Sequence, residues 1–392
     1  MGLFTHDQVN LDLLRKRAFN YRWASLEPDV IPLTAADPDF PVAPEISETI
    51  SNYASQRYFS YGSPEGNSEF KEAVAYWYKK RFNVLQDPSN VLPVNSAAYG
   101  LFIVAGMIAG KGNNVVIPNP VDFLFRKSVE AAGAEVRTCM VDKSTGEMDL
   151  EVLRSLITPS TSAIFICNPN NPLGKRLSPE HLNNLIEIAI EHNLWIVSDE
   201  IWADISFDGN VTSLFDPNLQ EYDKKLVVSG LSKNFALAGL RIGYVLSQNQ
   251  RVFNELLDSS GHKTTAFGIP VLSQLAGASA FTRSEYWLDA FLVHLKQMKG
   301  LTEEFIKDFP LFESLSSSAT YLSLPKISGA NISSADLVEL IHKEARVALV
   351  PGGAEWFETA SEGHIRICYA TSREIIQEAF ERMLFFARKK WA

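Results

Sequence analysis

The residues best suited to chemistry lie in short polar segments that follow apolar runs. The first is Lys233, in a small polar loop directly after the apolar run 226–229. A lysine in apolar surroundings loses proton affinity, and its neutral amine is the usual nucleophile for forming an imine with a carbonyl compound. A solvated lysine is the alternative for this segment taken alone. Arg241 follows in the same segment, among glycines and apolar residues.

Two further segments carry polar groups at the end of a predicted strand. Asn171 lies in a turn rich in proline and asparagine, 168–174, after the run 163–167, and Asp199 follows the run 194–198. Open α/β sheets bind ligands at the carboxyl edge of their strands, so both side chains are candidates. The alternatives are an ordinary loop for Asn171 and a turn or helix cap for Asp199.

The fourth segment, 363–370, is a predicted strand with one arginine, Arg366, among apolar neighbours. A buried arginine needs a carboxylate or a phosphate as partner. Arg366 is therefore either half of a structural ion pair or an anchor for an anionic substrate, and its own segment leaves both open.

The elements that must position these residues follow an alternating pattern. Short β-rich runs at 115–117, 163–167, 194–198 and 226–229 have helical patterns between them. Alternation of this kind predicts βαβ units and a mostly parallel sheet covered on both faces. The helix 179–192 is typical, with Ser178 as its N-cap and Pro179 in its first turn. We also expect a helix over 68–82.

The chain is too long for one hydrophobic core, which rarely grows beyond about 250–300 residues, since it has 392. Beyond residue 275 the pattern changes to a long amphipathic helix, 286–309, and strand-like segments at 319–324, 348–351 and 364–369. We predict a large α/β domain over 41–275 and a smaller α+β domain over 276–392, joined by the N-terminal segment 1–40.

Composition excludes several classes of partner. The net charge of −10 and the pI near 5.3 argue against nucleic acid and anionic membranes, which both attract basic surfaces. The longest apolar run, 101–109, is too short to span a bilayer, and no leader pattern is visible, so a cytoplasmic location is expected. Cys139, Cys167 and Cys368 are predicted to be reduced and buried. No metal-ligand spacing is present among the histidines.

Taken together, in this order and at this spacing, the four segments resemble the class I/II aminotransferase family of fold-type I enzymes that use pyridoxal 5'-phosphate (PLP). The resemblance extends from the stretch 36–40 to Arg366. It implies the PLP-dependent transferase fold type I. It also implies that Lys233 holds PLP as an internal aldimine and moves the substrate α-proton through a quinonoid intermediate. Asp199 would keep the pyridine nitrogen protonated, and Asn171 would bond the phenolic oxygen.

The resemblance also assigns the groups that hold the phosphate and the substrate. The phosphate would be bound by Arg241, Ser232 and the backbone amides of Ser96 and Ala97 at the start of a helix. Arg366 would take the substrate α-carboxylate, with Ala36 and Asn171 also at the substrate. Tyr61 matches the tyrosine that reaches the phosphate from a neighbouring subunit, which implies a homodimer.

Three positions depart from the family pattern. Trp202 stands where many relatives have a tyrosine whose hydroxyl bonds the cofactor. Trp202 is still expected to contact the cofactor, without that hydroxyl. Asp122 stands where an aromatic side chain stacks on the ring, and Phe123 is the candidate to replace it. Gly230 stands at a common phosphate-binding Ser or Thr, so Ser229 or Ser232 is the candidate substitute.

The resemblance implies an enzyme of amino-acid metabolism, an aminotransferase acting on an amino acid and a 2-oxo acid. Residues 198–204 also resemble the subgroup of cystathionine β-lyases, so a PLP-dependent carbon–sulfur β-lyase is the alternative. A PLP-binding regulatory module without turnover is a third reading, which the acidic charge and the short segment before Ala36 disfavour.

Overall fold

The computed structural model describes residues 2–264 and 267–391, and its largest element there is a seven-stranded sheet in the order β2-β8-β7-β6-β5-β3-β4. Strands β3 to β7 are parallel, and β8 runs antiparallel to both of its neighbours. The fold class predicted from the sequence, a mostly parallel α/β sheet, is confirmed. The strands are β2 (Val91–Val94), β3 (Asn114–Asn119), β4 (Glu135–Met140), β5 (Thr161–Cys167), β6 (Trp195–Asp199), β7 (Lys225–Gly230) and β8 (Gly243–Leu246).

Both faces of this sheet are buried, because alternate side chains of each strand enter different cores. On β5, Phe165 belongs to the cluster that packs with α4, α5 and α8, whereas Ile164 and Ile166 belong to the larger cluster on the other face. The surrounding helices are α2 (Pro44–Gln56), α3 (Ser68–Phe82), α4 (Ala97–Ile108), α5 (Leu124–Ala131), α6 (Leu150–Leu156), α7 (Pro179–Glu191), α8 (Gln250–Ser259) and α9 (Val271–Arg283).

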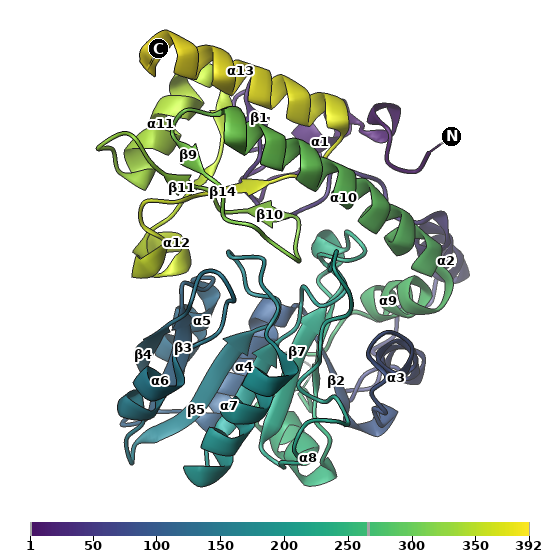
Figure 1. Cartoon of the computed structure of the whole chain (residues 1–392). Helices are drawn as coiled ribbons and strands as arrows, with labels where there is room; N and C mark the ends of the chain where they lie inside the picture. The colour runs from purple at the N-terminus through teal and green to yellow at the C-terminus, as the bar shows by residue number, and fades with distance from the viewer. Residues whose placement is uncertain (1, 265–266, 392) are drawn as a thin grey trace.

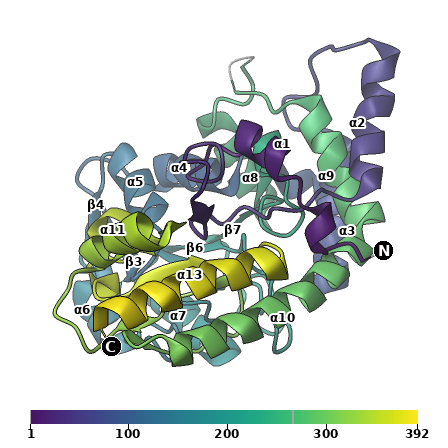
Figure 2. The same cartoon turned by 90° about the horizontal axis from the view of Figure 1, so that it is seen from above.

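The remaining elements lie together above the sheet (Figure 1), and the long helices α10 and α13 run side by side there (Figure 2). The N-terminal strand β1 pairs with β12, and β14 pairs with β10 and β13. The helices are α1 (Leu11–Arg17), α10 (Glu285–Asp308), α11 (Ser334–Ala345), α12 (Ala354–Phe357) and α13 (Arg373–Trp391). The strands are β1 (Ile31–Pro32), β9 (Phe312–Glu313), β10 (Leu322–Ser323), β11 (Lys326–Ile327), β12 (Val347–Ala348), β13 (Val350–Pro351) and β14 (Ile365–Cys368).

The elements expected from the sequence are present with bounds that differ by one to a few residues. The Ser178 hydroxyl caps α7 by accepting the backbone N–H of His181 at 3.1 Å, as the N-cap pattern predicts. The three cysteines are free and buried, as expected. The division into domains at residues 40 and 275 stays a prediction.

Among the described residues, no helix combines the length and the apolar character that crossing a membrane requires.

Candidate active site

A cavity of about 340 Å³ opens at the carboxyl ends of the parallel strands, and elements from both halves of the chain line it. The order of the strands places β5 between β3 and β6, so the connections from β3 and β5 leave in opposite directions. A crevice forms at such a switch point, where open α/β sheets bind their ligands. The polar segments after β5, β6 and β7 therefore meet in one place although they are far apart in the sequence.

Lys233 lines this cavity from the loop after β7. Its Nζ donates to the carbonyl oxygen of Ala36 at 2.7 Å and lies 5.5 Å from the centre of the Trp202 ring. Burial lowers the pKa of Lys233, and the positive charge of Arg366 lowers it further, while Asp37 and Asp122 act in the opposite direction. The amine is thus less basic than a solvated lysine, which suits a nucleophile.

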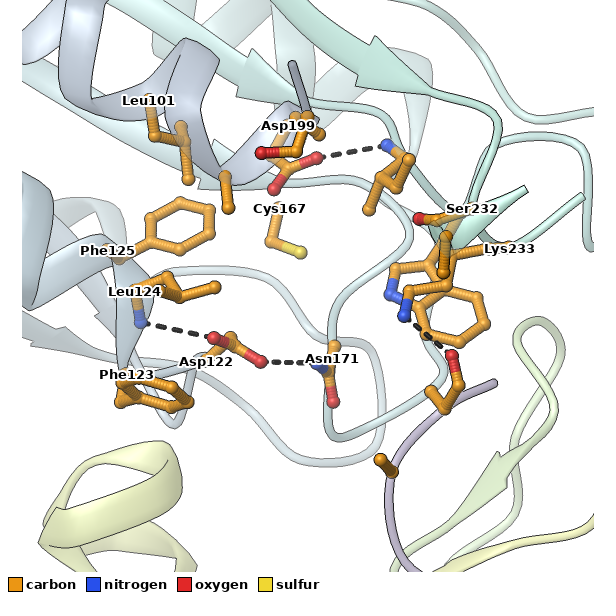
Figure 3. A pocket seen from close by; sticks show the side chains of 18 of the residues that line it. Leu101, Asp122, Phe123, Leu124, Phe125, Cys167, Asn171, Asp199, Ser232 and Lys233 are labelled. Carbon is orange, nitrogen blue, oxygen red and sulfur yellow. Dashed lines mark hydrogen bonds between the residues drawn. The ribbon is translucent and has the colours of Figure 1, made fainter. Parts of the chain in front are cut away.

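Asp199 ends strand β6 and projects into the same cavity (Figure 3). Its Oδ1 accepts the backbone N–H of Ile201 at 3.0 Å. Burial raises the pKa of Asp199 to about 7; the bond from Ile201 opposes this rise, and the charge of Asp122 adds to it. A carboxyl group held in this way gains a favourable partner when a protonated nitrogen binds beside it.

A chain of hydrogen bonds joins Arg366 to Asp122 through Asn171. The Nη1 of Arg366 donates to Oδ1 of Asn171 at 3.3 Å, and Nδ2 of Asn171 donates to Oδ2 of Asp122 at 2.9 Å. Figure 3 shows the side chains of Asp122 and Asn171 pointing toward each other, with a dashed line for the bond between them. The other carboxylate oxygen of Asp122 accepts the backbone N–H of Leu124 at 3.1 Å. The Asn171 amide is therefore held in one orientation.

An anion-binding corner lies at the N-terminus of α4. Ser96 is the N-cap residue, and its hydroxyl also accepts Nη2 of Arg241 at 3.0 Å. Strand β8 approaches this corner so closely that a Cβ on Gly243 would lie 2.7 Å from the backbone nitrogen of Ala97. Only glycine fits there. The N–H groups of a helix start beside a guanidinium favour a phosphate or carboxylate.

The structure brings nearly all of the residues predicted from the sequence to this one cavity. The lining includes Ala36, Ser96, Ala97, Phe123, Asn171, Asp199, Trp202, Ser232, Lys233, Arg241 and Arg366. Ser229 is not part of the lining; its hydroxyl donates to the backbone of Glu200. Tyr61 lies in a separate hollow and is 87% exposed.

Sequence reasoning missed several residues at the site. Tyr21 and Phe357 also line the cavity, and the Phe357 ring lies 4.8 Å from the guanidinium carbon of Arg366. Tyr321 packs edge-on against Trp202 and donates to the carbonyl oxygen of Ala36 at 3.2 Å. Each of these aromatic residues has an ordinary core or loop context in the sequence, so no local signal separates it from structural neighbours.

Comparison with known proteins matches residues 28–383 to the family model described as aminotransferase class I and II. The chain is 28% identical over 371 residues to an aspartate aminotransferase of Pyrococcus abyssi, and the match covers 92% of each chain. The aromatic aminotransferase structure from Pyrococcus horikoshii is 26% identical, with a TM-score of 0.85 over 94% of this chain and 98% of that one.

Cystalysin from Treponema denticola, whose structure contains PLP, superimposes with a TM-score of 0.90 over 99% of each chain, at 20% identity. Likeness at that identity concerns the fold alone. The relatives with higher identity named above are aminotransferases, so the carbon–sulfur lyase alternative is not favoured.

Proposed function

This chain belongs to the class I and II aminotransferase family, and from that premise we propose which residues of the cavity carry the reaction. It is a PLP-dependent aminotransferase, and its substrates are an amino acid and a 2-oxo acid. The observation that carries the residue assignment is the placement of the Lys233 amine and the Asp199 carboxyl group in one cavity, next to an anion-binding corner.

The side chains present fit PLP on three independent points. Asp199 has a raised pKa, so a ring nitrogen that carries a proton would stabilise its charged form. The start of α4 and Arg241 offer N–H donors for a phosphate group. Lys233 has a weakened affinity for protons, as a group that bonds to an aldehyde requires. Each of the three polar parts of PLP has a counterpart in the cavity.

Bound PLP supplies a ring that withdraws electrons from the α-carbon of the substrate. Lys233 then takes the α-proton on its Nζ and returns it to another carbon, which is general acid–base work suited to an amine of lowered pKa. Asp199 holds a proton on the ring nitrogen. Asn171, whose amide is held by Arg366 and Asp122, would donate the second N–H of its Nδ2 to the ring oxygen.

Arg366 binds the α-carboxylate of the substrate. Its Nη2 donates to the carbonyl oxygen of Thr34 at 2.9 Å, whereas its buried Nε has no hydrogen-bond partner among the described residues. An unpaired buried guanidinium N–H is costly, and a carboxylate that pairs with it removes that cost. A carboxylate fixed here would keep the α-carbon in the cavity that Lys233 also lines.

Replacing Arg366 with lysine should lower kcat/KM for every amino acid by about 100-fold, because one ammonium group cannot reproduce a bidentate pair. Steady-state kinetics measures this change. The control is Arg251→Lys on α8, an exposed position remote from the cavity, which should leave the kinetics unchanged. Equal losses in both variants would contradict the assignment of Arg366.

The function as a whole is tested with the purified protein reconstituted with PLP. An amino acid and 2-oxoglutarate should yield glutamate, measured by chromatography. Pyruvate and a thiol formed from cystathionine or cysteine, without glutamate, would instead identify a carbon–sulfur lyase.

The site is completed by a second copy of the chain through Tyr61. Tyr61 does not line the active-site cavity of its own chain, and it follows the exposed aromatic residues Tyr58 and Phe59, which are 79% and 64% exposed. Contiguous exposed aromatic residues mark an interaction surface. We assign this surface to a homodimer in which the Tyr61 hydroxyl of each subunit bonds the phosphate in the other.

Mixing two inactive variants tests this arrangement. Tyr61→Ala and Lys233→Ala should each be inactive at PLP concentrations that leave Tyr61→Ala mostly free of cofactor. After joint refolding at equal amounts, half of the dimers should contain one intact site, giving about a quarter of the wild-type activity. Absence of recovery, with mixed dimers verified by mass spectrometry, would place Tyr61 outside the site.

A further inference from the structure

One side of the cavity is a wall of three aromatic side chains, which we call the aromatic wall: Tyr21, Phe123 and Trp356. The ring of Trp356 stacks on Tyr21 with centroids 6.1 Å apart and meets Phe123 edge-on, also at 6.1 Å. All three line the cavity and are only partly buried, so their rings keep open surface. The backbone N–H of Phe123 donates a hydrogen bond to the carbonyl oxygen of Trp356, which holds these two residues of the wall together.

The aromatic wall lines the same cavity as Lys233 and Arg366. If Arg366 holds the α-carboxylate and Lys233 faces the α-carbon, the side chain is left with the free space beside them. Trp356 is next in the chain to Phe357, whose ring packs on the Arg366 guanidinium. Through Phe357 the wall therefore adjoins the proposed carboxylate anchor, Arg366.

The charges in the cavity disfavour a second carboxylate. The cations that line it in one subunit, within the described residues, are Lys233, Arg241 and Arg366, and each already has an assigned role. Asp122 adds a carboxyl group to the same lining, where it accepts Nδ2 of Asn171. Burial raises the pKa of Asp122, while the N–H of Leu124 and the charges of Arg366 and Lys233 act in the opposite direction. A second carboxylate beside Asp122 would carry the same burial cost.

We propose that this site selects an amino acid with an aromatic, uncharged side chain, held by the aromatic wall, and that Asp122 makes it reject aspartate and glutamate. The inference rests on the proposed roles of Lys233 and Arg366. It makes Asp122, Tyr21, Phe123 and Trp356 the specificity-determining residues of the chain.

Binding of unreactive carboxylates tests the inference without turnover. 3-Phenylpropionate and succinate share a carboxylate and an ethylene group. At the other end, 3-phenylpropionate has a phenyl ring and succinate has a second carboxylate. Calorimetry on the PLP-loaded wild-type protein should give a Kd at least about tenfold lower for 3-phenylpropionate. A Kd for succinate equal to or below that value would overturn the proposal, and this comparison needs no variant.

Variants then separate the two parts of the proposal. Trp356→Leu should raise the Kd for 3-phenylpropionate about tenfold and leave the Kd for succinate unchanged. Asp122→Asn, which keeps an acceptor for Asn171, should raise kcat/KM for L-aspartate about tenfold relative to L-phenylalanine. Phe385→Ala, an exposed aromatic position on α13, is the control and should change neither.

The outcomes also distinguish this inference from the proposed function. If no amino acid converts the cofactor, measured by its absorbance, the proposed function fails. If L-aspartate reacts faster than L-phenylalanine, only the specificity inference fails.

Discussion

Lys233→Ala protein should retain no PLP after borohydride reduction and denaturation, whereas the wild-type protein should keep one PLP per chain, fixed on Lys233. Its kcat should fall about 10⁴-fold, because the variant loses both the amine that bonds the cofactor and the base that moves the α-proton. Peptide mapping by mass spectrometry locates the reduced cofactor. Absorbance of the reconstituted protein gives the stoichiometry.

Lys225 is the matched control, because it lies at the opposite end of the same strand, β7, and its amine is also buried. Burial lowers the pKa of Lys225 as well, but its Nζ donates to the backbone of Gln220 and does not line the cavity. Lys225→Met should keep the covalent PLP. Cofactor fixed on Lys225 or on any other lysine would disprove the central assignment.

Asp199→Asn should stabilise the cofactor-free protein at pH 7 and yet lower kcat about 1000-fold in the PLP-loaded enzyme. The loss of activity is expected because an amide cannot hold the ring nitrogen in its protonated form. The gain in stability is expected because folding of the wild-type protein buries a carboxyl group that is charged at pH 7 in the unfolded chain. The amide of the variant has no charge to bury. Added PLP should raise Tm more in the wild-type protein than in the variant.

The pH dependence of this stabilisation has a defined sign. The pKa of Asp199 rises from 3.8 to about 7 on folding. Between these values the unfolded chain is ionised and the folded chain is still protonated, so the wild-type protein loses stability as pH rises from about 4 to about 7. The difference in Tm between Asp199→Asn and wild type should be near zero at pH 4 and largest above pH 7.

Glu200 supplies the control for this experiment. Burial also raises its pKa to about 7, but its Oε1 accepts the backbone N–H of Leu214 at 2.7 Å and it does not line the cavity. Glu200→Gln should show the same pH-dependent gain in Tm over the wild-type protein, with little change in kcat. If Asp199→Asn behaved in the same way as Glu200→Gln in both respects, the assigned role of Asp199 would be wrong.

The sequence by itself predicted the fold class and the polar segments that meet at the cavity. Lys233, Asp199 and Asn171 each follow an apolar run, and such runs form adjacent parallel strands whose carboxyl ends meet at one edge. Periodicity and capping residues are local signals, so the helix over α7 and the strands β5 to β7 could be predicted without knowing what packs on them.

Only the tertiary structure decided which groups touch. The hydrogen bond between Asn171 and Asp122 and the bond between Lys233 and Ala36 join segments distant in the sequence, and the aromatic wall brings Tyr21 from the N-terminal part to Trp356. A contact between distant residues depends on how whole elements pack, and no local pattern records it. For that reason the polar segments could be predicted from the chain, whereas the shape and charge of the cavity that they line required the fold.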